Sequence, residues 1–266
     1  MEASDSRHRH CGKDTLSLKS LCRLLYYPPF SGSLLRHRTH PDFLMGNSLF
    51  SAINTNKAMV EYMQKNGVIR SKKVAEVMET IDRALFIPDG IEPYHSRPVM
   101  IQFDLIIPAP NMHSTCLQLL EEHLQPGMRA LDVGSGNGYL TACFALMVGP
   151  RGCAVGVERM PGLVSSSVQS IQESAAAPLL RGGSLSVHFG DGRVGWPQHA
   201  PYDAIHVIAE ARDIPKAITD QLKPGGRLVW GLLLPGSIVE DFTVIDKKLD
   251  GSLTIRSEFS VGTCEF

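Results

Sequence analysis

The sequence lacks a long apolar run, and no stretch approaches the roughly 18 apolar residues that span a bilayer. It also lacks a charge imbalance, because 26 basic and 27 acidic residues leave a formal net charge of −1. A chain of this balance has no overall attraction for nucleic acid or for an anionic membrane. With 43% hydrophobic residues it can bury a substantial core. We therefore expect a soluble globular protein without a nucleic-acid or membrane partner.

The six cysteines are scattered, with no C-x-x-C pair and no histidine at metal-ligand spacing. This pattern indicates neither a zinc site nor a disulfide framework. It favours a reducing compartment, so we predict a cytoplasmic protein that carries no metal.

Residues 1–44 differ in composition from the rest of the chain. They hold two Arg-His clusters, at 7–10 and 36–40, and they show no apolar periodicity. We predict a poorly ordered extension over 1–44 and one domain over 45–266. Arginine, serine and leucine are also common in organelle transit segments, but the acidic residues of the extension argue against that alternative.

The first part of the domain shows helical patterns. Asn66-Gly67 suits the left-handed end of a helix, and Ser71 can cap a second helix that carries one apolar stripe. The segment that follows is irregular and rich in proline, which suits a lid or the wall of a binding site. The predicted helices run from Asn56 to Asn66, from Ser71 to Pro88 and from Ser114 to Leu124, with the irregular segment over 87–110.

Strand-like and helix-like runs alternate from residue 128 onward. This alternation predicts an α/β fold, with a mainly parallel sheet covered by helices on both faces. The last two strands, joined by a turn at Asp250-Gly251, are expected to complete one edge of the sheet. The predicted strands are 128–133, 154–158, 185–189, 204–207, 227–234, 241–247 and 253–260, and the predicted helices are 139–148, 163–172 and 214–222.

A glycine-rich turn joins the first of these strands to its helix, in the run Leu131-Asp-Val-Gly-Ser-Gly-Asn-Gly138. In an open parallel sheet the ligand crevice lies at such a turn. The three glycines allow a ligand close to the backbone, and the helix start attracts a carboxylate. Asp132 is expected to orient an ammonium group, directly or through water. The candidate loop residues are Gly134, Ser135, Gly136 and Asn137.

This spacing differs from that of a dinucleotide-binding loop. Loops that bind a pyrophosphate read G-x-G-x-x-G, whereas residues 134–138 read G-x-G-x-G after an acidic residue that would repel a pyrophosphate. The turn therefore favours a ligand with an amino-acid end.

Two further strand ends carry acidic residues where a nucleoside would need them. Glu158 ends the second strand roughly twenty residues after the loop, where a carboxylate can accept hydrogen bonds from both ribose hydroxyls. Asp191-Gly192 ends the third strand, where a carboxylate and a backbone N–H can meet the adenine edge. The glycine loop and the two acids together predict S-adenosyl-L-methionine as the cofactor.

Five stretches of the domain carry a family resemblance, namely Ala109–His113, Leu131–Gly149, Gly190–Arg193, Ala200–Val207 and Asp220–Val229. Through them the chain resembles protein-L-isoaspartate (D-aspartate) O-methyltransferases over about 56–260, most closely those of plants. The resemblance implies a Rossmann-like class I methyltransferase with a seven-stranded sheet. It also implies a monomeric, cytosolic enzyme that methylates the α-carboxylate of isoaspartyl residues in damaged proteins.

The resemblance implies a substrate segment over 94–113, where the sequence departs from the family. The family's active-site serine falls on Pro108, which offers neither a hydroxyl nor a backbone N–H to a carboxylate. The family's threonine falls on Ile106 and its first histidine on Asn111, whereas His113 matches. The implied catalytic positions are Pro108 and His113, and the implied substrate-binding positions are Ile106, Ile107 and Asn111.

Methyl transfer to a carboxylate needs no catalytic base, because the nucleophile is already ionised at neutral pH. What the reaction needs instead is hydrogen-bond donors to the substrate carboxylate, and the sequence has lost such donors at Pro108 and Ile106. Two alternatives therefore stay open. The chain is a catalytically silent paralogue that binds S-adenosylmethionine as an interaction module, or it is a methyltransferase for another carboxylate. Nucleic-acid base methylation is disfavoured, since Ile208-Ala-Glu-Ala lacks the polar-Pro-Pro-aromatic element that grips a flipped base. His206, on a buried strand, is predicted to be structural.

Overall fold

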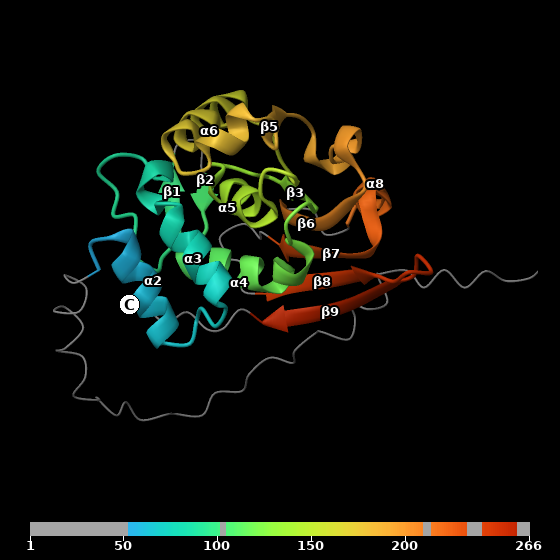
Figure 1. The fold of residues 1–266 in the computed structure, drawn as a ribbon, viewed down its shortest axis with the longest axis horizontal. Helices are drawn as coiled ribbons and strands as arrows, with labels where there is room; N and C mark the ends of the chain where they lie inside the picture. Colours follow the sequence, from blue (N-terminus) through green and yellow to red (C-terminus); the bar gives the residue numbers. More distant parts are fainter. Residues whose placement is uncertain (1–52, 102–104, 210–213, 233–240, 260–266) are drawn as a thin grey trace, which may run out of the picture. The chain divides into compact units, whose positions relative to one another are not determined.

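The computed structural model describes residues 53–101, 105–209, 214–232 and 241–259 (Figure 1). A seven-stranded sheet in the order β5-β4-β3-β6-β7-β8-β9 forms its centre, and β1 and β2 form a separate hairpin. The strands are β1 (Val99–Ile101), β2 (Leu105–Ile107), β3 (Arg129–Val133), β4 (Cys153–Glu158), β5 (Leu185–Phe189), β6 (Tyr202–Ala209), β7 (Leu222–Leu232), β8 (Asp241–Lys247) and β9 (Leu253–Phe259).

The sheet is parallel from β5 to β7, and β8 and β9 pair antiparallel at one edge. The chain runs outward from β3 to β5 and then returns to β6 on the other side of β3, so the strand order reverses there. A reversal of this kind opens a ligand crevice beyond the carboxyl ends of the strands. The predicted mostly parallel sheet of seven strands, with its antiparallel edge, is confirmed.

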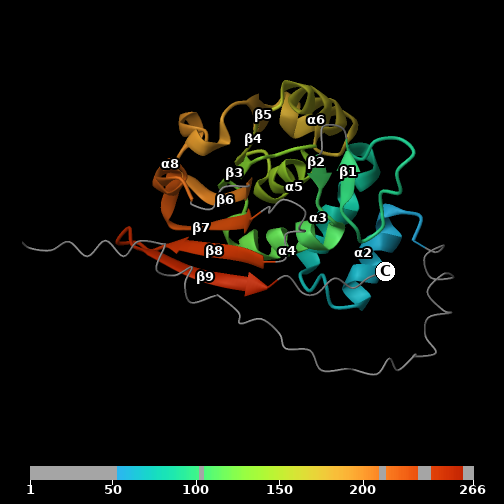
Figure 2. The same cartoon turned by 180° about the vertical axis from the view of Figure 1, so that it is seen from behind.

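Helices cover both faces of this sheet because successive side chains of a strand point to opposite sides. On one face Ala130 of β3 packs in a cluster with α5, and on the other Leu131 packs with Ile218 of α8. Figures 1 and 2 show α5 lying close to β3 and α8 beside the ends of β6 and β7. The helices are α2 (Asn56–Lys65), α3 (Lys72–Thr80), α4 (Pro110–Leu120), α5 (Tyr139–Val148), α6 (Pro161–Glu173), α7 (Ala177–Arg181) and α8 (Lys216–Gln221).

Several helix ends follow the predicted local signals. Ser71 caps α3 by accepting a hydrogen bond from the N–H of Val74. Asn66 ends α2, and the next residue, Gly67, adopts a left-handed φ of 71°. At the far edge Gly251 adopts a φ of 84° in the turn between β8 and β9.

The part of the chain between α3 and α4 differs from the prediction. α3 ends at Thr80 and not at Pro88, because Asp82 caps a new 3-10 turn, η4 (Arg83–Phe86). The segment expected to be irregular contains the β1–β2 hairpin. α4 begins at Pro110, four residues earlier than expected, since proline is favoured at the first position of a helix. The short helix α7 was not predicted.

The predicted extension over residues 1–44 lies outside the described residues, so its state stays a prediction. Within the described ranges, no helix has the length and apolar character needed to cross a bilayer.

Candidate functional site

A carboxylate ties the glycine loop to the end of the neighbouring strand. Glu158 of β4 is only 6% exposed, and its two oxygens accept hydrogen bonds from the N–H groups of Gly136 and Met160, each at 3.0 Å. The bond to Gly136 crosses from β4 to the loop after β3. Glu158 therefore lies at the predicted ligand crevice and holds the loop, while its contact with a ribose stays a prediction.

Two glycines of the loop are required by close approaches. Gly134 has a φ of 75°, and a Cβ on it would lie 2.6 Å from the carbonyl oxygen of Ile208 at the end of β6. Gly138 caps α5 with a φ of 82°, and a Cβ there would lie 2.9 Å from Cβ of Ser167 in α6. A side chain at Gly134 would collide with the backbone of β6, and one at Gly138 would collide with Ser167 of α6.

The polar residues of the loop have different environments. Ser135 is 7% exposed, and no described residue forms a hydrogen bond with its hydroxyl. Asn137 bonds within the protein, donating to the carbonyl of Phe86 at 2.9 Å and accepting from the N–H of Tyr139 at 3.2 Å. A buried unpaired hydroxyl is unfavourable, so Ser135 fits a site that a polar ligand completes. The binding of the amino-acid end of S-adenosylmethionine by this loop stays a prediction.

Asp132 lies directly beneath the loop and has two protein partners. It is 1% exposed; one oxygen accepts from Nδ1 of His206 at 2.8 Å and the other from the Thr141 hydroxyl at 2.5 Å. Burial lowers the pKa of His206, but the Cys116 thiol and the Asp132 carboxylate outweigh it and raise this pKa to about 10. His206 is thus a buried structural histidine, as predicted. A ligand ammonium at Asp132 stays a prediction.

The end of β5 reaches the same crevice. A Cβ on Gly192 would lie 2.6 Å from Cγ1 of Val133, the last residue of β3, so the turn after β5 reaches the end of β3. Asp191 accepts hydrogen bonds from the side chain and the backbone of Arg193, and these bonds lower the pKa of Asp191 to about 2. Asp191 is therefore ionised, and it is exposed to solvent; its predicted contact with adenine stays a prediction.

The predicted substrate positions on β2 face opposite ways. Ile106 is 42% exposed, whereas Ile107 is 3% exposed and packs with Ile87 and Val99. The side chain of Ile107 thus belongs to a small apolar cluster, and only that of Ile106 is open to solvent. Asn111, at the start of α4, is 9% exposed, and no described residue pairs with its Oδ1.

Sequence reasoning missed Arg83, which the structure places beside the substrate segment. Its guanidinium is fully buried and donates to the carbonyls of Pro93 at 2.9 Å and Pro108 at 2.8 Å. Burial lowers the pKa of Arg83 to about 10, while Tyr139 and Cys143 act in the opposite direction, so the group is cationic at neutral pH. Its only sequence signal was its place beside Asp82, since these two charged residues interrupt the otherwise apolar run 81–87.

His113 is the third partner of Arg83. Its Nδ1 lies 3.0 Å from Nη1 of Arg83, and since a guanidinium only donates, Nδ1 accepts and the ring proton sits on Nε2. Burial and the charges of Arg83 and His206 hold the pKa of His113 well below its usual value. His113 is therefore neutral and buried, with 4% of its surface exposed, and the centre of its ring lies 4.9 Å from that of Tyr139.

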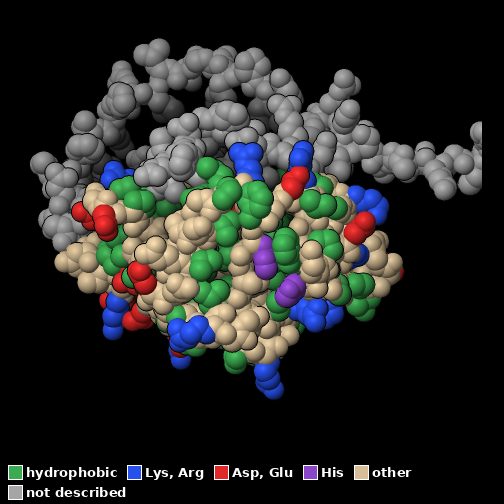
Figure 3. Space-filling view, turned by 90° about the horizontal axis from the view of Figure 1, so that it is seen from above, with side chains coloured by type: hydrophobic (Ala, Val, Ile, Leu, Met, Phe, Trp, Pro, Cys, Tyr) green, Lys and Arg blue, Asp and Glu red, His purple; other side chains and the backbone are tan. Residues whose placement is uncertain are grey.

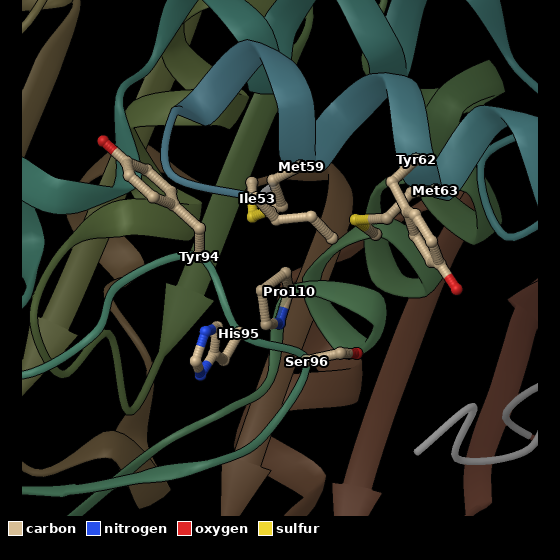
Figure 4. A pocket seen from close by; sticks show the side chains of 8 residues that line it. All are labelled: Ile53, Met59, Tyr62, Met63, Tyr94, His95, Ser96 and Pro110. Carbon is tan, nitrogen blue, oxygen red and sulfur yellow. The ribbon is translucent and has the colours of Figure 1, made fainter. Parts of the chain in front are cut away.

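A small, mainly apolar pocket lies between α2 and residues 94–96 (Figure 4). Met59 and Met63 of α2 and Pro110 at the start of α4 are among its lining residues. On the face of the molecule in Figure 3, the described basic and acidic side chains are intermixed and form no patch of one sign. In the described ranges, no cluster of His, Cys, Asp and Glu side chains has the arrangement of a metal site.

Comparison with known proteins gives the relationship. The family model for protein-L-isoaspartate(D-aspartate) O-methyltransferase matches residues 54–263. The protein-L-isoaspartate O-methyltransferase of Triticum aestivum is 57% identical over 210 residues, which cover 79% of this chain and 90% of the relative. Protein-L-isoaspartate O-methyltransferase 1 of Arabidopsis thaliana is 57% identical over 211 residues, with the same coverage of both chains.

A solved structure agrees with these relatives. A chain from Plasmodium falciparum described as a protein-L-isoaspartate O-methyltransferase, crystallised with S-adenosyl-L-homocysteine, superposes with a TM-score of 0.68 at 28% identity. The match covers 79% of this chain and 96% of that chain. The fold, the glycine loop tied to Glu158 and the matched residues 54–263 lead to one assignment. This chain belongs to the protein-L-isoaspartate(D-aspartate) O-methyltransferase family.

Proposed function

We propose that this protein transfers a methyl group from S-adenosyl-L-methionine to the α-carboxylate of L-isoaspartyl and D-aspartyl residues in damaged proteins. The observation that carries the proposal is the meeting of three strand ends: the loop after β3 is bonded to Glu158 of β4, and Val133 at the end of β3 approaches Gly192 after β5. A ligand with an amino-acid end, a ribose and a base fits such a row of sites. Membership of the family then supplies the class of acceptor.

The cofactor would be held by groups that the structure leaves in position. The amino-acid end is assigned to the glycine loop, residues Gly134, Ser135, Gly136 and Asn137. Asp132, which lies two residues before Gly134, is assigned to the ammonium group. Glu158 is assigned to the ribose, and Asp191 with Gly192 to the adenine. When bound, the cofactor supplies an electrophilic methyl group on a sulfonium.

The residues of the chain have to bind and orient a carboxylate that is already ionised. Burial of such a charge is unfavourable unless donors meet it, so hydrogen bonding in the substrate segment sets the efficiency of the reaction. Ile106 lies at the open side of this segment, Ile107 supports it by packing, and Asn111 and the neutral His113 are buried within it. Proton transfer by His113 is not required.

Pro108 supports a second candidate function. It replaces the hydroxyl that the family resemblance places here, and it has no N–H of its own. A chain of this kind could bind the cofactor without methylating isoaspartate, acting as a silent interaction module or on another carboxylate. The 57% identity to plant enzymes favours the repair activity over these alternatives. Because Pro108 lacks the donors, we propose that this activity is weakened.

The remaining assignments follow from the sequence. We propose a monomer of the cytoplasm that meets isoaspartyl proteins and peptides and binds no nucleic acid. The methyltransferase domain is assigned to residues 45–266 and a poorly ordered extension to residues 1–44, with organelle targeting by that extension as the alternative.

One assay tests the reaction. Purified protein is incubated with radiolabelled S-adenosylmethionine and an isoaspartyl peptide, and with the normal aspartyl twin as the control. Label incorporated into the isoaspartyl peptide alone supports the repair activity. Cofactor binding without incorporation into either peptide supports the silent module and refutes the proposed activity.

A further inference from the structure

We propose that Arg83 is a positioning residue of the substrate site, which turns the peptide group between Pro108 and Ala109 so that the Ala109 N–H donates to the acceptor carboxylate. This inference rests on the proposed function. It identifies a donor that survives the replacement of the family's serine by Pro108.

The orientation follows from the geometry of one peptide bond. Nη2 of Arg83 donates to the carbonyl oxygen of Pro108 at 2.8 Å. Among the described residues the single cis bond is Ala200-Pro201, so the bond from Pro108 to Ala109 is trans. In a planar trans peptide the C=O and the N–H point in opposite directions. The Ala109 N–H therefore points away from Arg83.

That N–H is buried and has no partner among the described residues. Ala109 is 4% exposed, and although its carbonyl accepts from Met112 and His113, no described residue accepts from its N–H. Buried backbone N–H groups without a partner are rare in folded proteins, and a ligand is one of the few things that satisfies them. Its position, one residue after Pro108, is where a substrate carboxylate would replace the missing protein partner.

Arg83 cannot swing away from this peptide, because its other donors are engaged. Nε bonds to the carbonyl of Pro93 and Nη1 to His113. On the far side of Ala109, Pro110 lines the same small pocket as Met59 and Met63 of α2 (Figure 4). A lysine would keep the charge but not the planar fork, so it could not hold all three acceptors. No carboxylate of a described residue pairs with Arg83, which leaves its positive charge to favour an anionic acceptor.

The test measures how the full-length protein distinguishes a charged acceptor from a neutral one. With S-adenosyl-L-homocysteine bound, calorimetry gives the Kd of an isoaspartyl peptide and of its isoasparaginyl twin, whose α-carboxylate is an amide. Wild type is expected to favour the carboxylate by about tenfold or more, as one charged hydrogen bond allows. Ala109→Pro removes the donor, and the φ of −61° at Ala109 already suits proline. Arg83→Lys keeps the positive charge but removes the planar set of guanidinium donors that holds the Pro108 carbonyl.

Both variants are expected to lose most of this preference while binding S-adenosyl-L-homocysteine within twofold of wild type. Arg97→Lys, at an exposed position of the same segment, is the matched control and is expected to keep the preference. A folded Ala109→Pro variant with the wild-type preference overturns the inference, as does a wild type that binds both peptides equally. If Arg83→Lys fails to fold, the preference of Ala109→Pro and that of wild type still decide whether the Ala109 N–H binds the carboxylate. A wild type that prefers the carboxylate peptide but does not methylate it contradicts the proposed function and leaves the inference about Arg83 and Ala109 standing.

Discussion

Replacing Glu158 by alanine is expected to weaken both the fold around the crevice and the affinity for the cofactor. Glu158 is 6% exposed and accepts two backbone hydrogen bonds, from Gly136 and Met160, each at 3.0 Å. A hydrogen bond to a charged group contributes about 1.5–3 kcal/mol. The loss of both bonds is therefore expected to lower the free energy of unfolding by about 3–6 kcal/mol, less where water replaces the carboxylate.

The cofactor affinity is expected to fall further than stability alone explains. Without Glu158 the glycine loop loses its tie to β4, and the two ribose bonds proposed for this carboxylate are also lost. One such bond corresponds to roughly tenfold in Kd or more. For a domain of this size, about 3 kcal/mol of stability shifts the melting temperature by roughly 6–12 °C.

The assay combines thermal melting with calorimetric titration of S-adenosyl-L-methionine and S-adenosyl-L-homocysteine. Glu158→Gln gives an intermediate case, because an amide can accept one of the two backbone bonds but not both. Glu173→Ala, at an exposed acid of α6, is the control and is expected to behave as wild type. A Glu158→Ala protein with wild-type melting and wild-type affinity would refute the reasoning, and a folded wild type without binding heat at millimolar ligand would refute the cofactor site itself.

Three further predictions can be checked independently. Deletion of residues 1–44 is expected to leave the melting temperature and cofactor affinity unchanged, because the segment lacks apolar periodicity; a fall of many degrees would show that it packs on the domain. Ile106→Thr combined with Pro108→Ser is expected to raise kcat/KM on an isoaspartyl peptide by about tenfold to a thousandfold, measured at saturating S-adenosylmethionine; a wild type that is equally fast contradicts the role given to Pro108. The pKa of His206 is raised from 6.5 to about 10, so its stabilising effect is complete below pH 6.5 and is lost as the pH rises toward 10. His206→Gln should therefore flatten the decline of melting temperature over that range, and a variant with the wild-type slope would show that His206 does not titrate there.

Much of the fold and of the cofactor site is predictable from the sequence because the signals are local. The helix over 139–148 and the strand over 185–189 have the predicted bounds, since the helix is a nearly continuous apolar run between two glycines and the strand alternates apolar and polar residues before Gly190. The glycines at 134 and 138 mark positions where the backbone conformation itself excludes a side chain. Such features need no knowledge of distant residues.

The tertiary structure alone decides what surrounds the substrate segment. Arg83 meets His113 across 30 positions, and Asp132 meets His206 across 74, and neither pairing leaves a periodic trace in the sequence. The hairpin of β1 and β2 was missed for a related reason, because strands of three residues are too short to show alternation. Hydrophobic period and turn chemistry act between neighbours in the chain, whereas a buried polar partner is selected by the packing of elements that the chain brings together only on folding.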